Sequence, residues 1–143
     1  MAGHRDDALA MMAQAREVAA MLPEQMPALP PTVHRLQATP AQVALYNVSV
    51  WWGLGDAGAA LAAGQGLRAE QFPTQERRAR LHTDLARAHV LRHEPEPAIA
   101  RLLAAYQHAP GEVRDRTSIR AVAVELVQRH RRTPGARELA ALL

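Results

Sequence analysis

Residues 84–105, DLARAHVLRHEPEPAIARLLAA, hold two helical patterns with a turn between them. On both sides of the turn, leucine and alanine recur at intervals of three and four residues, which is the spacing of one face of an α-helix. The first pattern ends near His93-Glu94. Pro95 and Pro97 then fall in the first turn of the second helix, where a missing backbone N–H costs little. The stretch therefore predicts two antiparallel helices joined as a hairpin.

A spacing of 38 residues relates this hairpin to the sequence on either side of it. The predicted turns carry Asp56, Glu94 and Arg132 at that interval. The same offset superposes two sets of residues inside the second helices, namely Ala60, Ala98 and Ala136, and then Gly64, Leu102 and Ala140. The small alanine and glycine side chains in these sets allow the two helices of a pair to cross closely. The interval predicts three stacked hairpins over residues 40–143, with Ala60 and Ala98 facing the interior.

The first of these hairpins has the clearest end signals. Thr39 can cap a helix that has Pro40 at its first position, and Gln42 can reach back to complete a capping box. Gly55 supplies a left-handed stop after that helix, and Asp56 can cap the next one, from residue 57 to about 66.

The other hairpins are bounded by similar residues. Pro73-Thr74 opens the first helix of the middle hairpin, and Ala109-Pro110 closes its second helix. In the third hairpin, we expect Asp115 to cap a helix over residues 116–131, and Thr133-Pro134 to open a terminal helix that ends at Leu142 and Leu143.

Residues 1–22 are predicted to form an N-terminal helix, capped at Asp6 or Asp7, that is the second half of an incomplete hairpin. Residues 23–39 contain Pro27, Pro30 and Pro31 without apolar periodicity, which predicts an extended or irregular connection. The apolar side of residues 8–22 lacks a neighbouring helix, so we expect the Pro-rich segment or a second copy of the chain to cover it.

The composition agrees with an all-α fold. Hydrophobic residues make up 48% of the 143 residues but aromatic residues only 3%, so most apolar side chains are Ala, Leu and Val rather than the aromatic residues that favour strands. Cysteine is absent, which excludes disulfides and thiolate chemistry. No long apolar run suggests a signal peptide or a membrane span, so we expect a soluble cytoplasmic protein without membrane contacts.

The basic residues do not indicate a nucleic-acid partner. All 17 are arginine and the net charge is +3, but arginines alternate with acids in segments such as Glu76-Arg77-Arg78 and Arg114-Asp115-Arg116. A surface that follows a phosphate backbone needs a segregated basic stripe. The one dense cluster, Arg129-His130-Arg131-Arg132, closes a predicted helix, where basic side chains complement the helix dipole.

The repeating positions resemble the tetratricopeptide repeat. The packing positions of that family are met in the middle and first hairpins by Leu85, Ala86, Ala98, Ala105 and Pro110, and by Ala44, Trp51, Ala60 and Leu67. The family's usual period is 34 residues. We attribute the four extra residues here to longer connections around Pro73 and Gly111. The resemblance implies a superhelix of about seven stacked helices.

A closer resemblance covers residues 40–143. The segments that carry it are Val43-Ala44-Leu45, Gly55-Asp56, Ala79-Arg80-Leu81, Asp84-Leu85-Ala86-Arg87-Ala88, Ala98-Ile99, Leu102-Leu103 and Ala109-Pro110. Together they resemble the C-terminal helical-repeat domain of actinobacterial transcriptional regulators whose N-terminal part is a helix-turn-helix of the XRE type. This resemblance implies a signalling domain that receives a peptide, a small molecule or a partner protein and relays the event to DNA binding. The domain itself would not contact nucleic acid.

The tetratricopeptide resemblance places the ligand in a concave groove lined by the first helix of each hairpin. The matching positions are Gln42, Leu45, Ser49 and Trp52, then Arg80, Thr83, Arg87 and Val90, then Glu125 and Gln128. Trp52 is expected to face this groove, whereas Trp51, about 100° around the helix, packs inward. Two arginines beside an exposed tryptophan suit an acidic peptide or a terminal carboxylate.

Enzymatic and metal functions are disfavoured by the residue pattern. His89 and His93 share a helix face, but with His82 they lack a nearby carboxylate to complete a metal site, and we interpret them as packing imidazoles. Asp84 is interpreted as a structural carboxylate paired with Arg77, Arg80 or Arg87. No nucleophile–base arrangement or phosphate loop is present, so we predict neither an enzyme nor a cofactor.

Three functions compete at this point. The first is the sensing domain of a regulator, and the second is a stand-alone helical scaffold that oligomerises, for example as a homodimer through its first helix. The third is a helical enzyme or metal protein, the class that the residue pattern disfavours.

Overall fold

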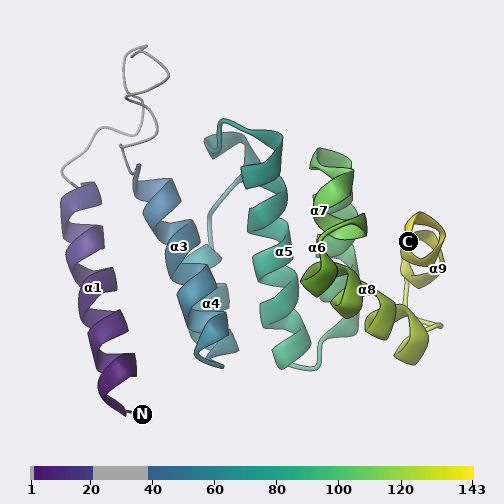
Figure 1. Ribbon diagram of the computed structural model, residues 1–143, viewed down its shortest axis with the longest axis horizontal. Coiled ribbons are helices and arrows are strands. Elements are labelled where there is room, and N and C mark those ends of the chain that lie inside the picture. The colour runs from purple at the N-terminus through teal and green to yellow at the C-terminus, as the bar shows by residue number, and fades with distance from the viewer. Residues whose placement is uncertain (1, 21–38) are drawn as a thin grey trace.

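The computed structural model describes residues 2–20 and 39–143, and within them every element is helical (Figure 1). The N-terminal part contains α1 (Ala2–Ala20), α3 (Pro40–Gly53), α4 (Ala57–Gly64) and the short 3₁₀ helix η1 (Ala69–Gln71). The C-terminal part contains α5 (Gln75–Leu91), α6 (Pro95–His108), α7 (Pro110–Arg114), α8 (Thr117–Arg129) and α9 (Ala136–Leu142). The prediction of an all-α fold is confirmed.

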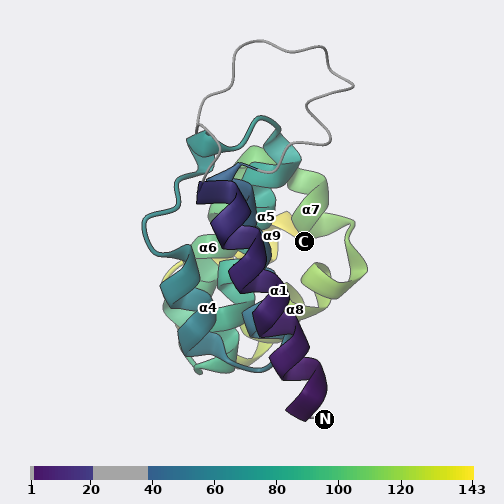
Figure 2. The same cartoon turned by 90° about the vertical axis from the view of Figure 1, so that its left-hand side faces the viewer.

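The helices follow one another in space in the order of the chain. α3 packs against α4, and α5 packs against α6. The first helices of the two pairs, α3 and α5, lie side by side in front of their partners (Figure 1). α1 packs on the outer side of α3, at the end of the stack (Figure 2). The predicted Pro-rich connection, residues 23–39, lies outside the described residues except for Thr39. No helix in the described ranges is both long and apolar enough to cross a membrane.

The local signals at the first hairpin are confirmed. The backbone N–H of Gln42 donates to Thr39 Oγ1 at 3.2 Å, and the Thr39 N–H donates back to Gln42 Oε1 at 3.4 Å, which is the reciprocal capping box. Gly55 has φ +81°, and Asp56 Oδ1 accepts from the Ala59 N–H at 3.0 Å. Thr74 likewise caps α5, because its hydroxyl oxygen accepts from the Arg77 N–H at 3.2 Å.

The predicted start of the first helix was wrong, because α1 begins at Ala2 and places Asp6 and Asp7 inside the helix, exposed to solvent. A tertiary contact holds the additional turn. The Arg5 guanidinium pairs with Asp56 Oδ2 at 3.1 Å and lies over the ring of Trp51, 5.5 Å from its centroid. Pattern reading within the helix gave no sign of these partners.

Two helix starts in the C-terminal part were also predicted wrongly. Asp115 does not cap α8; it ends the unpredicted helix α7, and its carboxylate pairs with Arg114 at 3.2 Å. The last helix begins at Ala136 rather than after Thr133-Pro134, since Gly135 adopts φ +84° and interrupts the chain there.

The repeating alanines are buried as predicted. Ala60 and Ala98 are 0% exposed and Ala136 is 2% exposed. Gly64 is so close to α5 that a Cβ there would lie 2.7 Å from Leu85 Cδ2, which shows how closely α4 and α5 approach. The register fails in the third hairpin, where α9 begins at Ala136 instead of after Arg132, and where Ala140 is exposed because α9 buries Leu139.

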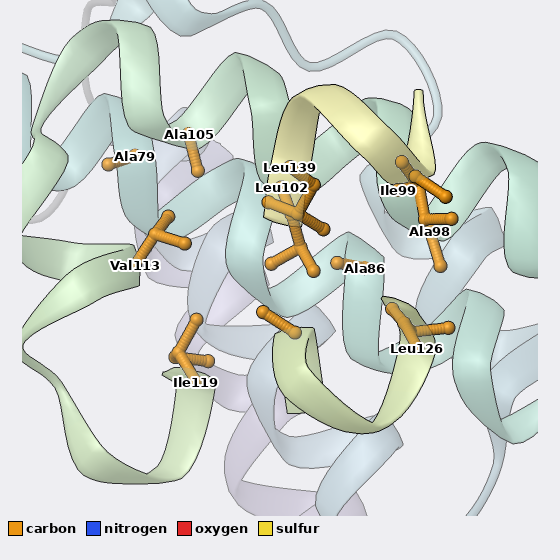
Figure 3. Close-up of a cluster of buried hydrophobic side chains, with 12 residues drawn as sticks. Ala79, Ala86, Ala98, Ile99, Leu102, Ala105, Val113, Ile119, Leu126 and Leu139 are labelled. Atoms are coloured by element: carbon orange, nitrogen blue, oxygen red, sulfur yellow. The ribbon is translucent and has the colours of Figure 1, made fainter. Parts of the chain in front are cut away.

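The buried side chains form two clusters. One joins α3, α4 and one side of α5 around Val48, Leu81 and Phe72. The other joins α5 to α9, where Leu102, Ile119, Leu126 and Leu139 meet (Figure 3). The two clusters share α5, so the position of this helix determines how the halves of the chain are arranged.

We expect Gly135→Ala to lower the free energy of unfolding by about 2–3 kcal/mol. The positive φ costs an L-residue about 1–2 kcal/mol, and the new Cβ would lie 3.0 Å from Ile99 Cγ2 and 3.1 Å from Leu103 Cδ1. Gly55→Ala is the matched control, because Gly55 has φ +81° but open space around it. Urea denaturation of both variants checks this, and equal losses would contradict the role of crowding at Gly135.

Candidate functional site

A cavity of about 430 Å³ opens between α3, α5 and α7. It is lined by Gln42, Leu45, Tyr46, Ser49, Glu76, Arg77, Arg80, Asp84 and Glu112. Small-molecule and peptide-anchor sites commonly have volumes in the range of about 300–1,000 Å³ and combine apolar walls with a few polar groups. Leu45 supplies buried apolar surface here, and Tyr46 is 57% exposed at the edge. The cavity therefore has the size and mixed lining of a binding site.

A buried carboxylate forms part of its wall. Asp84 is 1% exposed, and its Oδ1 accepts a hydrogen bond from the indole Nε1 of Trp52 at 3.3 Å. Its other oxygen, Oδ2, is buried without a hydrogen-bond partner anywhere in the described part of the chain. Burial raises the pKa of Asp84 to about 6, although the positive charges of Arg80 and Arg87 act in the opposite direction. The sequence-based interpretation of an ion-paired structural carboxylate is therefore incorrect in its main feature, the pairing.

Arg87 is held beside this carboxylate rather than free in solvent. Its guanidinium lies 4.2 Å from the centroid of the Trp52 ring, and its Nη2 donates to Ser118 Oγ at 2.8 Å. Burial lowers the pKa of Arg87, and the nearby charge of Arg116 lowers it further. Its Nε is also buried without a partner among the described residues. The side chain thus braces Trp52 and keeps positive charge close to Asp84.

Charged groups of both signs surround the cavity opening. Arg80 is exposed on α5, one turn before Asp84. Glu112 of α7 is neutralised by Arg116, whose Nη1 donates to its carboxylate at 3.1 Å. Arg80 is exposed and lines the cavity with Glu76 and Arg77, so its guanidinium can pair with an anion there.

The structure brings together part of the predicted ligand groove. Gln42, Ser49 and Arg80 line the one cavity, and Trp52 and Arg87 lie against Asp84 at its wall. Thr83 is 0% exposed and its hydroxyl donates to the backbone oxygen of Arg80 at 3.1 Å, so it belongs to the helix core.

The two predicted groove residues on α8 lie elsewhere. Glu125 and Val90 line a separate cavity of about 200 Å³ near His93 and His130, and Gln128 is exposed. The reason is α7, which packs against α5 in the place expected for the first helix of the third hairpin. Glu112 of α7 therefore completes the cavity instead.

The lining residues that were not predicted for the groove are Tyr46, Glu76, Arg77, Asp84 and Glu112. A signal for Asp84 was available, because it is four residues after Arg80 and three before Arg87, and so shares their helix face. Tyr46 and Glu112 carried no such signal, because their positions depend on how α3 and α7 pack against α5.

The prediction of packing imidazoles holds for His82 but not for His93, which is exposed, and His89 has a nearby carboxylate that was not expected from the sequence. The His82 ring stacks on His108 with centroids 5.5 Å apart, and its Nδ1 is 3.1 Å from Arg101 Nη1. Burial lowers the pKa of His82 to about 4, with Arg101 adding to the effect, so the ring is neutral at pH 7. His89 Nδ1 is 2.8 Å from Glu94 Oε2. Within the described ranges, no three His, Cys, Asp or Glu side chains are grouped as a metal site.

Comparisons of the chain with protein families, with curated proteins and with solved structures gave no match.

Proposed function

We propose that this protein is a non-enzymatic ligand-binding domain that holds an extended peptide in the cavity between α3, α5 and α7. The observation that carries the proposal is the buried Asp84 carboxylate with its unpaired Oδ2. A buried acceptor without a partner costs about 1–3 kcal/mol, more when it is charged. A chain tolerates that cost at a site where a bound partner supplies the missing donor.

A peptide fits the chemistry of this site. Its backbone or side-chain N–H groups can donate to Asp84 Oδ2, and a side-chain or terminal carboxylate can bind the exposed Arg80. The half-buried Trp52, braced by Arg87, offers a rigid apolar surface beside them. An acidic peptide, or one that ends in a free carboxylate, is therefore the ligand class that the site supports best.

The experiment uses a Trp51→Phe background, in which Trp52 is the one remaining tryptophan of the two in the chain. Random hexapeptides with free C-terminal carboxylates are selected on the immobilised protein, and their affinities are measured by Trp52 fluorescence. We expect Arg80→Ala to weaken selected peptides about tenfold or more, the effect of one charged hydrogen bond. Arg137→Ala, an exposed change on α9, is the matched control.

Two outcomes would count against the proposal. Selected peptides that bind Arg80→Ala as tightly as the unchanged chain would place their site elsewhere. Versions of the selected peptides with amidated C-termini, and with any acidic residues replaced by their amides, should bind more weakly. Equal affinity would mean that a peptide carboxylate plays no part in binding.

We also propose that the bound signal controls transcription in a bacterial cytoplasm, as the resemblance of residues 40–143 suggests. This part of the proposal requires a DNA-binding domain that acts with the chain. Finding a helix-turn-helix in the same native reading frame would support it, and a reading frame or partner set without one would favour a stand-alone binding protein.

One observation favours the second candidate function, a self-associating scaffold. Met11 on α1 is 66% exposed, while its neighbour Met12 is 2% exposed against the rest of the fold. A second copy packing on Met11 would cover it. Light scattering that shows a monomer over a wide concentration range would reject this alternative.

A further inference from the structure

A second cavity, of about 490 Å³, lies between α1, α3 and α4, separate from the proposed peptide site. Its walls are mostly apolar, and its lining residues are Arg16, Pro40, Val43, Ala44, Asn47, Trp51, Ala59, Ala62 and Ala63. The volume is in the range that holds a small molecule of two or three rings.

Asn47 is the unusual residue of this cavity. It is 1% exposed, and its Oδ1 is buried without a hydrogen-bond partner in the described part of the chain. Leaving such an amide oxygen unpaired costs about 1–3 kcal/mol, whereas a leucine, which has the same branched shape but larger terminal groups, would carry no such penalty. Polar groups that lower stability are found at binding sites, because a bound ligand can supply the missing hydrogen-bond donor.

The other polar and aromatic groups restrict the ligand further. Trp51 is half-buried, and Arg5 lies 5.5 Å above its ring while pairing with Asp56, so the indole is held in place between α1 and α4. Arg16 comes from α1 and is exposed at the cavity. Its charge favours an anionic substituent over a cationic one.

We propose that this cavity binds a planar small molecule that donates a hydrogen bond to Asn47, lies against Trp51 and carries an anionic group near Arg16. The ligand is a small molecule rather than a second peptide. A peptide backbone carries many donors and acceptors that need partners, whereas this mostly apolar cavity offers one buried acceptor, Asn47 Oδ1. This site does not depend on the peptide cavity, so failure of one proposal leaves the other intact.

Anilinonaphthalene sulfonate is a suitable probe, since it combines a planar ring system, one amine N–H and one sulfonate. In a Trp52→Phe background, Trp51 is the remaining tryptophan, so its fluorescence reports binding of the probe, and variants of the lining residues locate the site. We expect saturable quenching of Trp51 by the probe. Asn47→Leu should weaken the probe about tenfold, the loss of one buried hydrogen bond, and should raise the thermal midpoint of the free protein.

Ala62→Phe provides an independent variant, because Ala62 is exposed on α4 and a larger side chain there narrows the cavity without entering the core. It should abolish quenching, Arg16→Ala should weaken the probe several-fold, and Arg137→Ala should leave the affinity unchanged. Absence of saturable quenching in the unchanged cavity would overturn the proposal. Equal affinity for Asn47→Leu, whose folding the thermal midpoint verifies, would overturn it as well.

Discussion

Asp84→Asn is expected to raise the free energy of unfolding by about 3 kcal/mol at neutral pH. Burial in the folded protein raises the pKa of Asp84 from 3.8 to about 6, and each pKa unit corresponds to about 1.4 kcal/mol. Above pH 7 the folded chain must hold an ionised carboxylate that is 1% exposed and whose Oδ2 has no partner in the described residues. The neutral amide removes that cost and keeps an oxygen that can accept from Trp52.

The pH dependence has a defined sign. Between pH 3.8 and about 6 the folded chain keeps the Asp84 proton while the unfolded chain releases it. The contribution of Asp84 to the free energy of unfolding is therefore fully present below pH 3.8 and is lost as the pH rises through about 6. The two proteins should be nearly equal in stability near pH 4 and should differ most above about pH 7.

Urea unfolding at about pH 4 and about pH 8 measures this difference, with Asp7→Asn on the exposed side of α1 as the control. The control should stay within about 0.5 kcal/mol of the unchanged chain at both values. A less stable Asp84→Asn protein at neutral pH would instead support the ion-paired carboxylate that the sequence suggested. The same variant should bind the selected peptides about tenfold more weakly, because it replaces the unpaired acceptor by a donor.

The elements that could be predicted from sequence are those whose causes are local. Thr39 and Gln42 cap each other within one turn, and Gly55 provides its own left-handed backbone, so short patterns are enough to place them. The start of α1 and the existence of α7 depend on contacts with distant residues, as the Arg5–Asp56 pair shows. Periodicity within one helix cannot contain that information.

The residues of the candidate cavity also divide into those placed by local helical spacing and those placed by packing between helices. Gln42, Ser49 and Arg80 lie together because each faces the same side of α3 or α5, which their helical spacing predicts. The assignment of Glu125 required the third hairpin to repeat the geometry of the first two, and α7 changes that geometry. The ionisation of Asp84 depends on its burial, which follows from the packing of α3 on α5 rather than from neighbouring residues.

Phe72→Ala is expected to lower the free energy of unfolding by about 3–5 kcal/mol, the usual loss for a fully buried phenylalanine. Phe72 is 0% exposed and belongs to the cluster that joins α3, α4 and α5. It follows η1, its carbonyl accepts from Arg78 Nε at 2.9 Å, and its own N–H donates to the Ala69 oxygen at 3.0 Å. The connection from α4 to α5 is thus anchored both by the buried Phe72 side chain and by the hydrogen bonds of the Phe72 backbone.

This anchor gives a physical reason for the interval of 38 residues. The extra length was attributed to loops around Pro73 and Gly111, but those places hold η1 with Phe72 and the helix α7, both of which add buried residues. Phe72→Leu, which keeps most of the apolar volume, should cost about 1 kcal/mol and remains measurable if the alanine variant does not fold. Thermal and urea unfolding of both variants test the idea. A loss below about 1 kcal/mol for Phe72→Ala would mean that α4 and α5 hold together without their connection, and that the longer repeat has another cause.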